Sequence, residues 1–135
     1  MTFRWPVVGR ADCLGAAAKA REALSDAGWT KREASELAVV VAELASNAVR
    51  HAGGGECVLE LEPERWELCV CDDGPGFPRE ILADAGRTDG VQPRRGLGSG
   101  LSCARRMSAS LSLENVRPKG ARIVARQNRC KRSEP

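Results

Sequence analysis

Residues 30–55 read TKREASELAVVVAELASNAVRHAGGG and contain the strongest helix signal in the chain. Thr30 followed by Glu33 is a capping box, in which each side chain satisfies the free backbone N–H of the other residue. Apolar residues then recur at spacings of three and four and form a stripe that faces a core: Leu37, Val40, Val41, Leu44 and Ala48. The three glycines end this pattern, so we expect one helix from Thr30 to about His51.

The segments before this helix predict a strand and a second helix. Phe3–Val8 has the composition of a short edge strand, where Pro6 is tolerated because an edge residue can lack a hydrogen-bond donor. The alanine-rich run Asp12–Ala27 contains helix formers throughout and stops at Gly28. After the central helix, two alternating runs predict an antiparallel hairpin: Cys57–Leu61 and Trp66–Cys71.

The rest of the chain alternates between glycine-rich loops and regular segments. We expect a loop over Asp72–Pro78, short helical turns over residues 79–85, a long loop over Gly86–Gly100, a helix over Ser99–Ala109, and strands over Leu111–Val116 and Ala121–Gln127. This order predicts an α+β fold: a two-layer α/β sandwich with a mostly antiparallel, mixed sheet and helices on one face. Residues 1–129 should form a single domain, and residues 130–135 a basic, disordered tail.

Composition excludes several classes of protein. The 21 Lys and Arg residues and 18 Asp and Glu residues give a net charge of +3, far below the excess typical of a nucleic-acid-binding protein. Positive charge gathers in the last third, where it forms either a solvated surface or a surface for an acidic partner. We find no membrane-spanning segment and no signal-peptide core, so we expect a cytoplasmic protein whose six cysteines are reduced thiols rather than disulfides or zinc ligands.

Glu43 and Asn47 are the first candidate functional residues. They are four residues apart, so both project from one helix face, which Arg50 and His51 continue. A carboxamide oxygen beside a carboxylate suits a magnesium ion and an activated hydroxyl group. The alternative is an ordinary solvated helix face.

Asp72 is the second candidate. It follows the strand Trp66–Cys71 with the same parity as Leu68 and Val70, which should aim its carboxylate into the interior. A buried carboxylate needs donors, and the exocyclic amine of a purine is one. Gly74 and Gly76 would let the backbone approach a base, although acidic-glycine turns are also common without any ligand.

A glycine run forms the third candidate: Gly96, Leu97, Gly98, Ser99, Gly100 and Leu101. It precedes a predicted helix, so free backbone N–H groups and a helix N-terminus should point at whatever occupies the loop. Phosphate groups bind well in such places. It is not a Walker loop, because no Gly-Lys-Ser/Thr follows, and a flexible linker is the alternative.

The order of these motifs resembles the nucleotide site of the GHKL, or Bergerat-fold, ATPases. The resemblance is closest to the anti-sigma-factor serine kinases, and among them to the RsbT-like switch kinases, and it spans residues 10–127. It rests on three runs: Glu43-Leu-Ala-Ser-Asn47-Ala-Val-Arg-His51-Ala-Gly-Gly-Gly55, Asp72-Asp-Gly-Pro-Gly76 and Gly96-Leu-Gly-Ser-Gly-Leu-Ser-Cys-Ala-Arg-Arg-Met107.

This resemblance implies a role for each matched residue. Glu43 would polarise an attacking serine hydroxyl, and Asn47 would coordinate Mg²⁺. Asp72 would bind the adenine amine of ATP, with Gly74 and Gly76 beside the base. The run from Gly96 to Leu101 would line the triphosphate as a closing lid, and either Arg94 or Arg95 would neutralise the transferred phosphoryl group.

Two positions need separate comment. The family usually has Gly-Thr where this chain has Gly120-Ala121, so one contact to adenine, often water-mediated, should be missing. A lost hydrogen bond of this kind weakens binding by about 0.5–1.5 kcal/mol. His51 should be a packed, hydrogen-bonded residue at the helix C-terminus rather than a catalytic base.

The resemblance implies an ATP- and Mg²⁺-dependent serine/threonine protein kinase. Its substrate would be a STAS-domain antagonist protein in a partner-switching pathway, and phosphorylation would release the kinase to bind a second target such as a phosphatase, with indirect effects on sigma-factor activity. Alternatives are an anti-sigma factor that sequesters a sigma subunit and an ATP-dependent binding module with little transfer activity. A histidine-kinase catalytic domain is disfavoured by the short lid and by the lack of a preceding phosphoacceptor helix pair.

Overall fold

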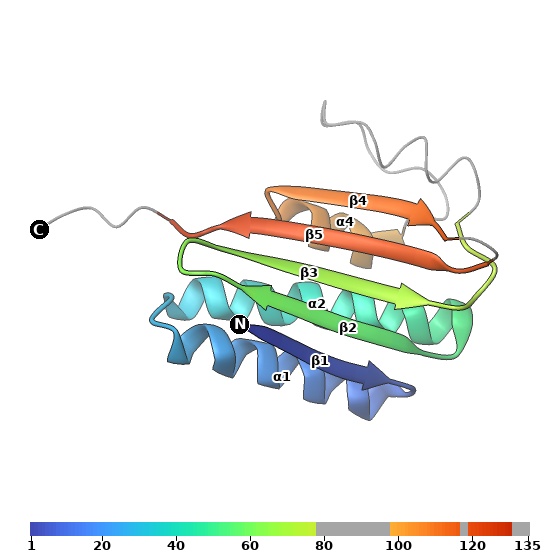
Figure 1. The fold of residues 1–135 in the computed structure, drawn as a ribbon, viewed down its shortest axis with the longest axis horizontal. Coiled ribbons are helices and arrows are strands. Elements are labelled where there is room, and N and C mark those ends of the chain that lie inside the picture. Colours follow the sequence, from blue (N-terminus) through green and yellow to red (C-terminus); the bar gives the residue numbers. More distant parts are fainter. Residues whose placement is uncertain (78–97, 117–118, 131–135) are drawn as a thin grey trace, which may run out of the picture.

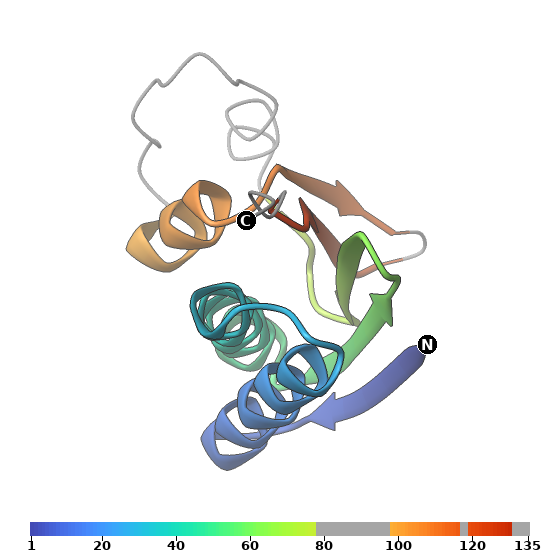
Figure 2. The same cartoon turned by 90° about the vertical axis from the view of Figure 1, so that its left-hand side faces the viewer.

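The computed structural model describes residues 1–77, 98–116 and 119–130. These residues form three helices and five strands in the order β1 (Thr2–Val7), α1 (Arg10–Asp26), α2 (Lys31–Ala52), β2 (Gly55–Leu61), β3 (Arg65–Asp72), α4 (Gly98–Arg106), β4 (Ser110–Asn115) and β5 (Ala121–Asn128). The strands make one sheet in the order β1-β2-β3-β5-β4. The helices cover one face of this sheet (Figures 1 and 2), which confirms the two-layer sandwich. All four described pairings are antiparallel, so the sheet is not mixed there.

Helix α2 lies along the middle of the sheet (Figure 1) and begins as predicted. The Glu33 N–H donates to Thr30 Oγ1 over 3.1 Å, and the Thr30 N–H donates to Glu33 Oε1 over 2.9 Å. The apolar stripe from Leu37 to Ala48 is buried, and the left-handed conformation of Gly53 ends the helix. Burial of each Leu or Val in this stripe stabilises the fold by about 1.5–3 kcal/mol.

Strand β3 has different side chains on its two faces. Trp66, Leu68 and Val70 are buried against the helices, whereas Cys69 and Cys71 are half-buried on the opposite face. Strand β3 pairs with β2 on one side as far as Cys71 and with β5 on the other side as far as Asp72. The predicted hairpin and its register relative to the core are therefore confirmed.

Some predicted boundaries differ from the observed ones. Helix α4 ends at Arg106 rather than Ala109, because the Ala109 N–H already donates to the Arg126 carbonyl over 2.7 Å and leads into β4. Helix α4 also begins at Gly98, so the last three residues of the predicted loop are helical. The predicted turns over residues 79–85 and most of the basic tail lie outside the described residues. Among the described helices, none combines the length and apolar character that crossing a bilayer requires.

Candidate functional site

Helix α2 carries both Glu43 and Asn47 in its C-terminal half. Asn47 is only 5% exposed and is the buried polar side chain among the described residues, while Glu43 is half-buried. The four-residue spacing separates them by about 6 Å along the helix axis. A fully solvated helix face is therefore the wrong interpretation for Asn47. A buried carboxamide that is retained in an apolar helix needs a polar partner.

The last turn of α2 differs from the prediction. Arg50 and His51 are exposed, so the expectation of a packed His51 is wrong. Successive helical residues point about 100° apart. Here the neighbouring Ala52 faces the turn after β3, and His51 is directed to solvent.

Asp72 ends β3 with its carboxylate held by two backbone donors. Oδ1 accepts from the Gly74 N–H over 2.8 Å and from the Ala121 N–H over 3.3 Å. The side chain shares a face with Leu68 and Val70, as its parity predicts, but it is half-buried rather than buried. Within the described residues Oδ2 accepts no hydrogen bond, so the second oxygen of a fixed carboxylate is available to a ligand.

The Ala121 contact bears on the missing threonine. Ala121 is buried and donates its backbone N–H to Asp72. Unlike threonine, it has no side-chain hydroxyl to offer a ligand. The alanine therefore removes one possible ligand contact without disturbing the support of the carboxylate.

The turn after Asp72 packs against the end of α2. A Cβ atom added to Gly74 would lie 2.6 Å from the Ala52 Cβ, which no real packing tolerates. Ala52 is five residues beyond Asn47 on the same helix, or about 7.5 Å along its axis. Gly74 thus permits the close contact between the Asp72 turn and the last turn of α2.

Asn115 holds the other side of this turn. Its Oδ1 accepts from the Phe77 N–H over 2.7 Å, and its Nδ2 donates to the Phe77 carbonyl over 3.1 Å. Gly76 has a φ of +85°, and a Cβ there would lie 2.6 Å from Asn115 Oδ1. Sequence reasoning missed Asn115. The one available signal was an asparagine at the end of a predicted strand, where its propensity is poor.

Helix α4 points its N-terminus toward the same end of the sheet. Its C-terminal side is fixed where Gln127 Nε2 donates to the Met107 carbonyl over 3.1 Å, and Gln127 lies opposite Trp66 near the start of β3. The helix therefore begins on the side where β3 ends at Asp72 (Figure 1). Leu101 and Ala104 are buried, and α4 packs against α2.

The structure describes only part of the predicted lid. Gly98, Ser99 and Gly100 form the first turn of α4, so a flexible linker is the wrong interpretation for them. Arg94, Arg95, Gly96 and Leu97 lie outside the described residues. Three of the predicted parts are thus brought to one end: the Asn47 face, the Asp72 turn and the start of α4.

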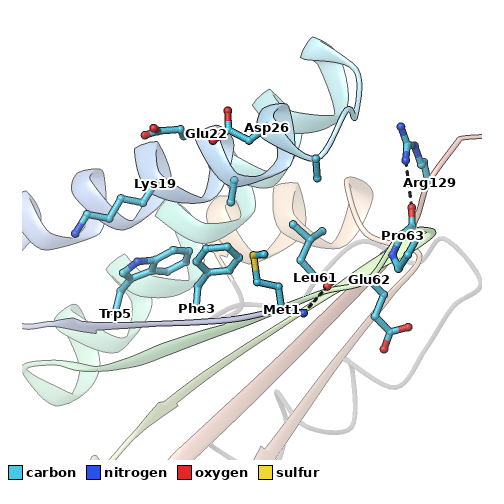
Figure 3. Close-up of a pocket in the computed structure, with 12 residues that line it drawn as sticks. Met1, Phe3, Trp5, Lys19, Glu22, Asp26, Leu61, Glu62, Pro63 and Arg129 are labelled. Atoms are coloured by element: carbon cyan, nitrogen blue, oxygen red, sulfur yellow. Dashed lines mark hydrogen bonds between the residues drawn. The ribbon is translucent and has the colours of Figure 1, made fainter.

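Two cavities show how different the ends of the molecule are. A groove of about 740 Å³ between α1 and β1 is lined by Phe3, Trp5, Leu61 and other mostly apolar residues, and no predicted site residue lines it (Figure 3). A smaller cavity of about 480 Å³ at the opposite end is lined by Asp72, Asp73 and the glycines that follow α2. Of the predicted site residues, Asp72 lines the smaller cavity.

Comparison with known proteins identifies the family. A family model for the histidine kinase-like ATPase domain matches residues 11–127. The serine/threonine-protein kinase RsbT of Bacillus subtilis is 28% identical over 120 residues, which cover 84% of this chain and 86% of RsbT. The sensor protein CseC of Streptomyces avermitilis is 41% identical over 90 residues, covering 61% of this chain and 18% of CseC, so the chain spans less than a fifth of that relative.

Solved structures support the same fold. A chain of the SiaB–SiaC complex from Pseudomonas aeruginosa superposes with a TM-score of 0.66 at 18% identity, over 95% of this chain and 89% of that chain. The catalytic domain of histidine kinase ThkA gives a TM-score of 0.57 at 14% identity, over 96% and 97% of the two chains. The family model and the RsbT alignment confirm the resemblance to the GHKL ATPases and to RsbT-like kinases that the motifs predict, and the solved structures confirm the fold. The chain belongs to the histidine kinase-like ATPase domain family.

Proposed function

We propose that this protein is an ATP- and Mg²⁺-dependent serine/threonine protein kinase that acts on a small partner protein. The observation that carries the proposal is the fixed carboxylate of Asp72, in a turn that packs against the end of α2, the helix that also carries the buried Asn47. The chain also aligns with the kinase RsbT over most of both lengths.

Asp72 would recognise the adenine ring. Its Oδ1 is occupied by two backbone N–H groups, so Oδ2 is left to accept from the exocyclic amine. Because the carboxylate is already oriented, binding would not have to order it. Gly74 and Gly76 would keep the turn that presents Asp72 to the base packed against Ala52 and Asn115.

Asn47 would hold Mg²⁺ and the N-terminal turn of α4 would bind phosphate. Mg²⁺ commonly takes one or two protein oxygens and completes its shell with water and substrate phosphates. Asn47 offers one hard oxygen, and the described residues contain no cluster of three or more acidic, histidine or cysteine ligands. This donor set fits an ion carried by a nucleotide. Gly98, Ser99, Gly100 and Leu101 would place backbone N–H groups near the phosphates, with Gly96 and Leu97 completing the lid.

Glu43 would act as the base. The serine hydroxyl oxygen of the partner would form a bond to the γ-phosphorus, the bond to the bridging oxygen would break to release ADP, and the hydroxyl proton would pass to the Glu43 carboxylate. Arg94 or Arg95 would balance the charge on the transferred group. Bound Mg²⁺ would supply charge neutralisation of the phosphates.

The partner would be a STAS-domain antagonist, and a cytoplasmic location goes with this pathway. Phosphorylation adds a charge of about −1.5 to −2 at an interface and can release the kinase to a phosphatase or another target. The rival functions are sequestration of a sigma factor and nucleotide-dependent binding with little transfer. Copurification of a sigma subunit in place of a STAS protein would favour the first.

A second candidate is transfer to histidine. It is favoured by the 41% identity with the sensor protein CseC over 90 residues. The two phosphoryl linkages are chemically distinct, because phosphohistidine is hydrolysed by acid and phosphoserine is not.

Incubation with γ-labelled ATP, Mg²⁺ and a candidate STAS protein tests the proposal. We expect acid-stable label on the partner, and no label with the Glu43→Ala variant. Glu36→Ala is the matched control, since Glu36 lies on the same helix, is half-buried like Glu43 and pairs with the exposed Arg32. Acid-labile label would favour the histidine alternative, and label that never leaves ATP would favour a pure binding module.

A further inference from the structure

Two thiols lie side by side on the sheet face that the helices do not cover. Cys69 and Cys71 alternate along β3 with the buried Leu68 and Val70, and their Sγ atoms are 3.5 Å apart. Both side chains are half-buried, and among the described elements none covers this face (Figure 2). The pair is therefore accessible to small reagents and takes no part in the proposed nucleotide chemistry.

The neighbours of the pair make the two sulfur atoms unequal. Burial and the hydrogen bond with Cys69 raise the pKa of Cys71 to about 11, so Cys71 stays a protonated thiol. The Arg122 guanidinium also interacts with Cys69, while it pairs with Glu114 over 3.3 Å. Cys69 is thus the member of the pair that a guanidinium contacts by a hydrogen bond.

The remaining cysteines are placed differently. Cys57 is buried on the helix-facing side of the sheet, where desolvation raises its pKa to about 12, and Cys13 is buried beside it. Cys103 is on α4, on the other side of the sheet, and Cys130 is exposed after β5. A close and accessible thiol pair is therefore found at Cys69 and Cys71.

We propose that Cys69 and Cys71 are an oxidation site that closes reversibly to a disulfide when it meets a peroxide. The Cys69 sulfur attacks one oxygen of hydrogen peroxide, the O–O bond breaks, and the sulfur becomes a sulfenic acid as one water is released. The Cys71 sulfur then attacks the Cys69 sulfur, the S–O bond breaks, and a second water leaves with the Cys71 proton. The two thiols lose two electrons, and the peroxide gains them.

Closing the bond must alter β3. Residues two apart on a strand have Cα atoms about 6.8 Å apart, at the upper end of the roughly 4.4–6.8 Å that disulfides span. The Sγ–Sγ distance has to fall from 3.5 Å to about 2.05 Å, which favours a shorter spacing next to Asp72, the residue whose Oδ1 holds the Gly74 and Ala121 N–H groups. Oxidation should loosen these two hydrogen bonds, a consequence that does not depend on the proposed function.

A tryptic peptide provides a direct test. Cleavage after Arg65 and Arg79 yields residues 66–79, which contain Cys69 and Cys71 and no other cysteine. The full chain carrying Cys130→Ser would be treated with hydrogen peroxide, alkylated and digested without reductant. We expect this peptide to be lighter than its unalkylated dithiol form by the mass of two hydrogen atoms, and dithiothreitol to restore two alkylatable thiols. Cys103→Ser, the control, should leave this result unchanged.

Two further readouts keep the proposal open to refutation. In the unsubstituted chain, phenylarsine oxide should bridge the pair and block both thiols from alkylation, a result that needs no variant to fold. Amide hydrogen exchange at Gly74 and Ala121 should become faster after oxidation. The proposal is wrong if peroxide leaves both thiols of the peptide alkylatable, or if it converts Cys69 to sulfinic acid without loss of the two hydrogens.

Discussion

The two ends of this fold differ in what they offer a ligand. At one end, the groove between α1 and β1 is the roomier, with about 740 Å³ and a stacked pair of rings, Phe3 and Trp5, whose centroids are 5.8 Å apart (Figure 3). At the other end, the cavity beside Asp72 has about 480 Å³ but adjoins a carboxylate held by two backbone donors. Volume alone would select the groove. Directed polar groups select the Asp72 end, because orientation and specificity in a site come from a few placed polar atoms.

Among substitutions that compare the two ends of the fold, the largest effect should be the loss of phosphoryl transfer when Glu43 is changed. Glu43→Gln removes the proton acceptor with little change in shape, so we expect the rate of transfer to fall about 10²–10⁴-fold while ATP binding is kept. Single-turnover transfer and equilibrium ATP binding would be measured on the same preparation. Glu36→Gln should change neither. A loss of ATP affinity with unchanged turnover of bound ATP would contradict the assignment of Glu43 as the base.

The next largest effect should be a loss of ATP affinity when Asp72, at the polar end, is changed. Asp72→Asn keeps an oxygen for the Gly74 and Ala121 N–H groups but replaces the free Oδ2 by an amide donor, which would face the donor amine of adenine. We expect ATP affinity to fall by about 1–3 kcal/mol, roughly 5- to 150-fold. Asp73→Asn, one residue further and exposed, is the matched control. Equal losses in the two variants would show that only net charge matters.

Substitution of Asn115 tests whether ATP binding requires the turn after β3 to be held in place. Asn115→Ala removes both hydrogen bonds to Phe77, and we expect a loss of about 0.5–1.5 kcal/mol, roughly 2- to 10-fold in ATP affinity. Calorimetric titration with ATP would measure this loss of affinity, with Ser112→Ala on the same strand as the control. Unchanged affinity would mean that the turn is rigid without this contact.

The smallest expected effect lies at the groove. Trp5→Ala removes one of the two stacked rings, and we expect thermal stability to fall while ATP affinity changes less than about twofold, since the substitution is far from Asp72 and distant sites act independently. Thermal unfolding and calorimetric titration would be compared. A large loss of ATP affinity in a folded variant would place the nucleotide in the groove and overturn the comparison.

Local pattern explains what the sequence could predict. The capping box at Thr30, the alternation that turns Asp72 toward the helices, and the antiparallel hairpin all depend on neighbours within a few residues. These features agree with the structure because local preference and global packing favour the same conformation.

Non-local packing explains what the sequence could not predict. Asn115 is 38 residues from Phe77, so no local pattern reveals the contact. Gly98 and Gly100 have poor helix propensity, yet they belong to a helix whose Leu101 and Ala104 are buried against the core. His51 is exposed because the direction of the last turn of α2 depends on the tertiary contact of Ala52 with Gly74.

A crystal structure with a non-hydrolysable ATP analogue and Mg²⁺ tests the central claim most directly. The account predicts the exocyclic amine of adenine within hydrogen-bonding distance of Asp72 Oδ2, and the triphosphate between Asn47 and the start of α4. A nucleotide seated between α1 and β1, or an adenine ring turned away from Asp72, would contradict it.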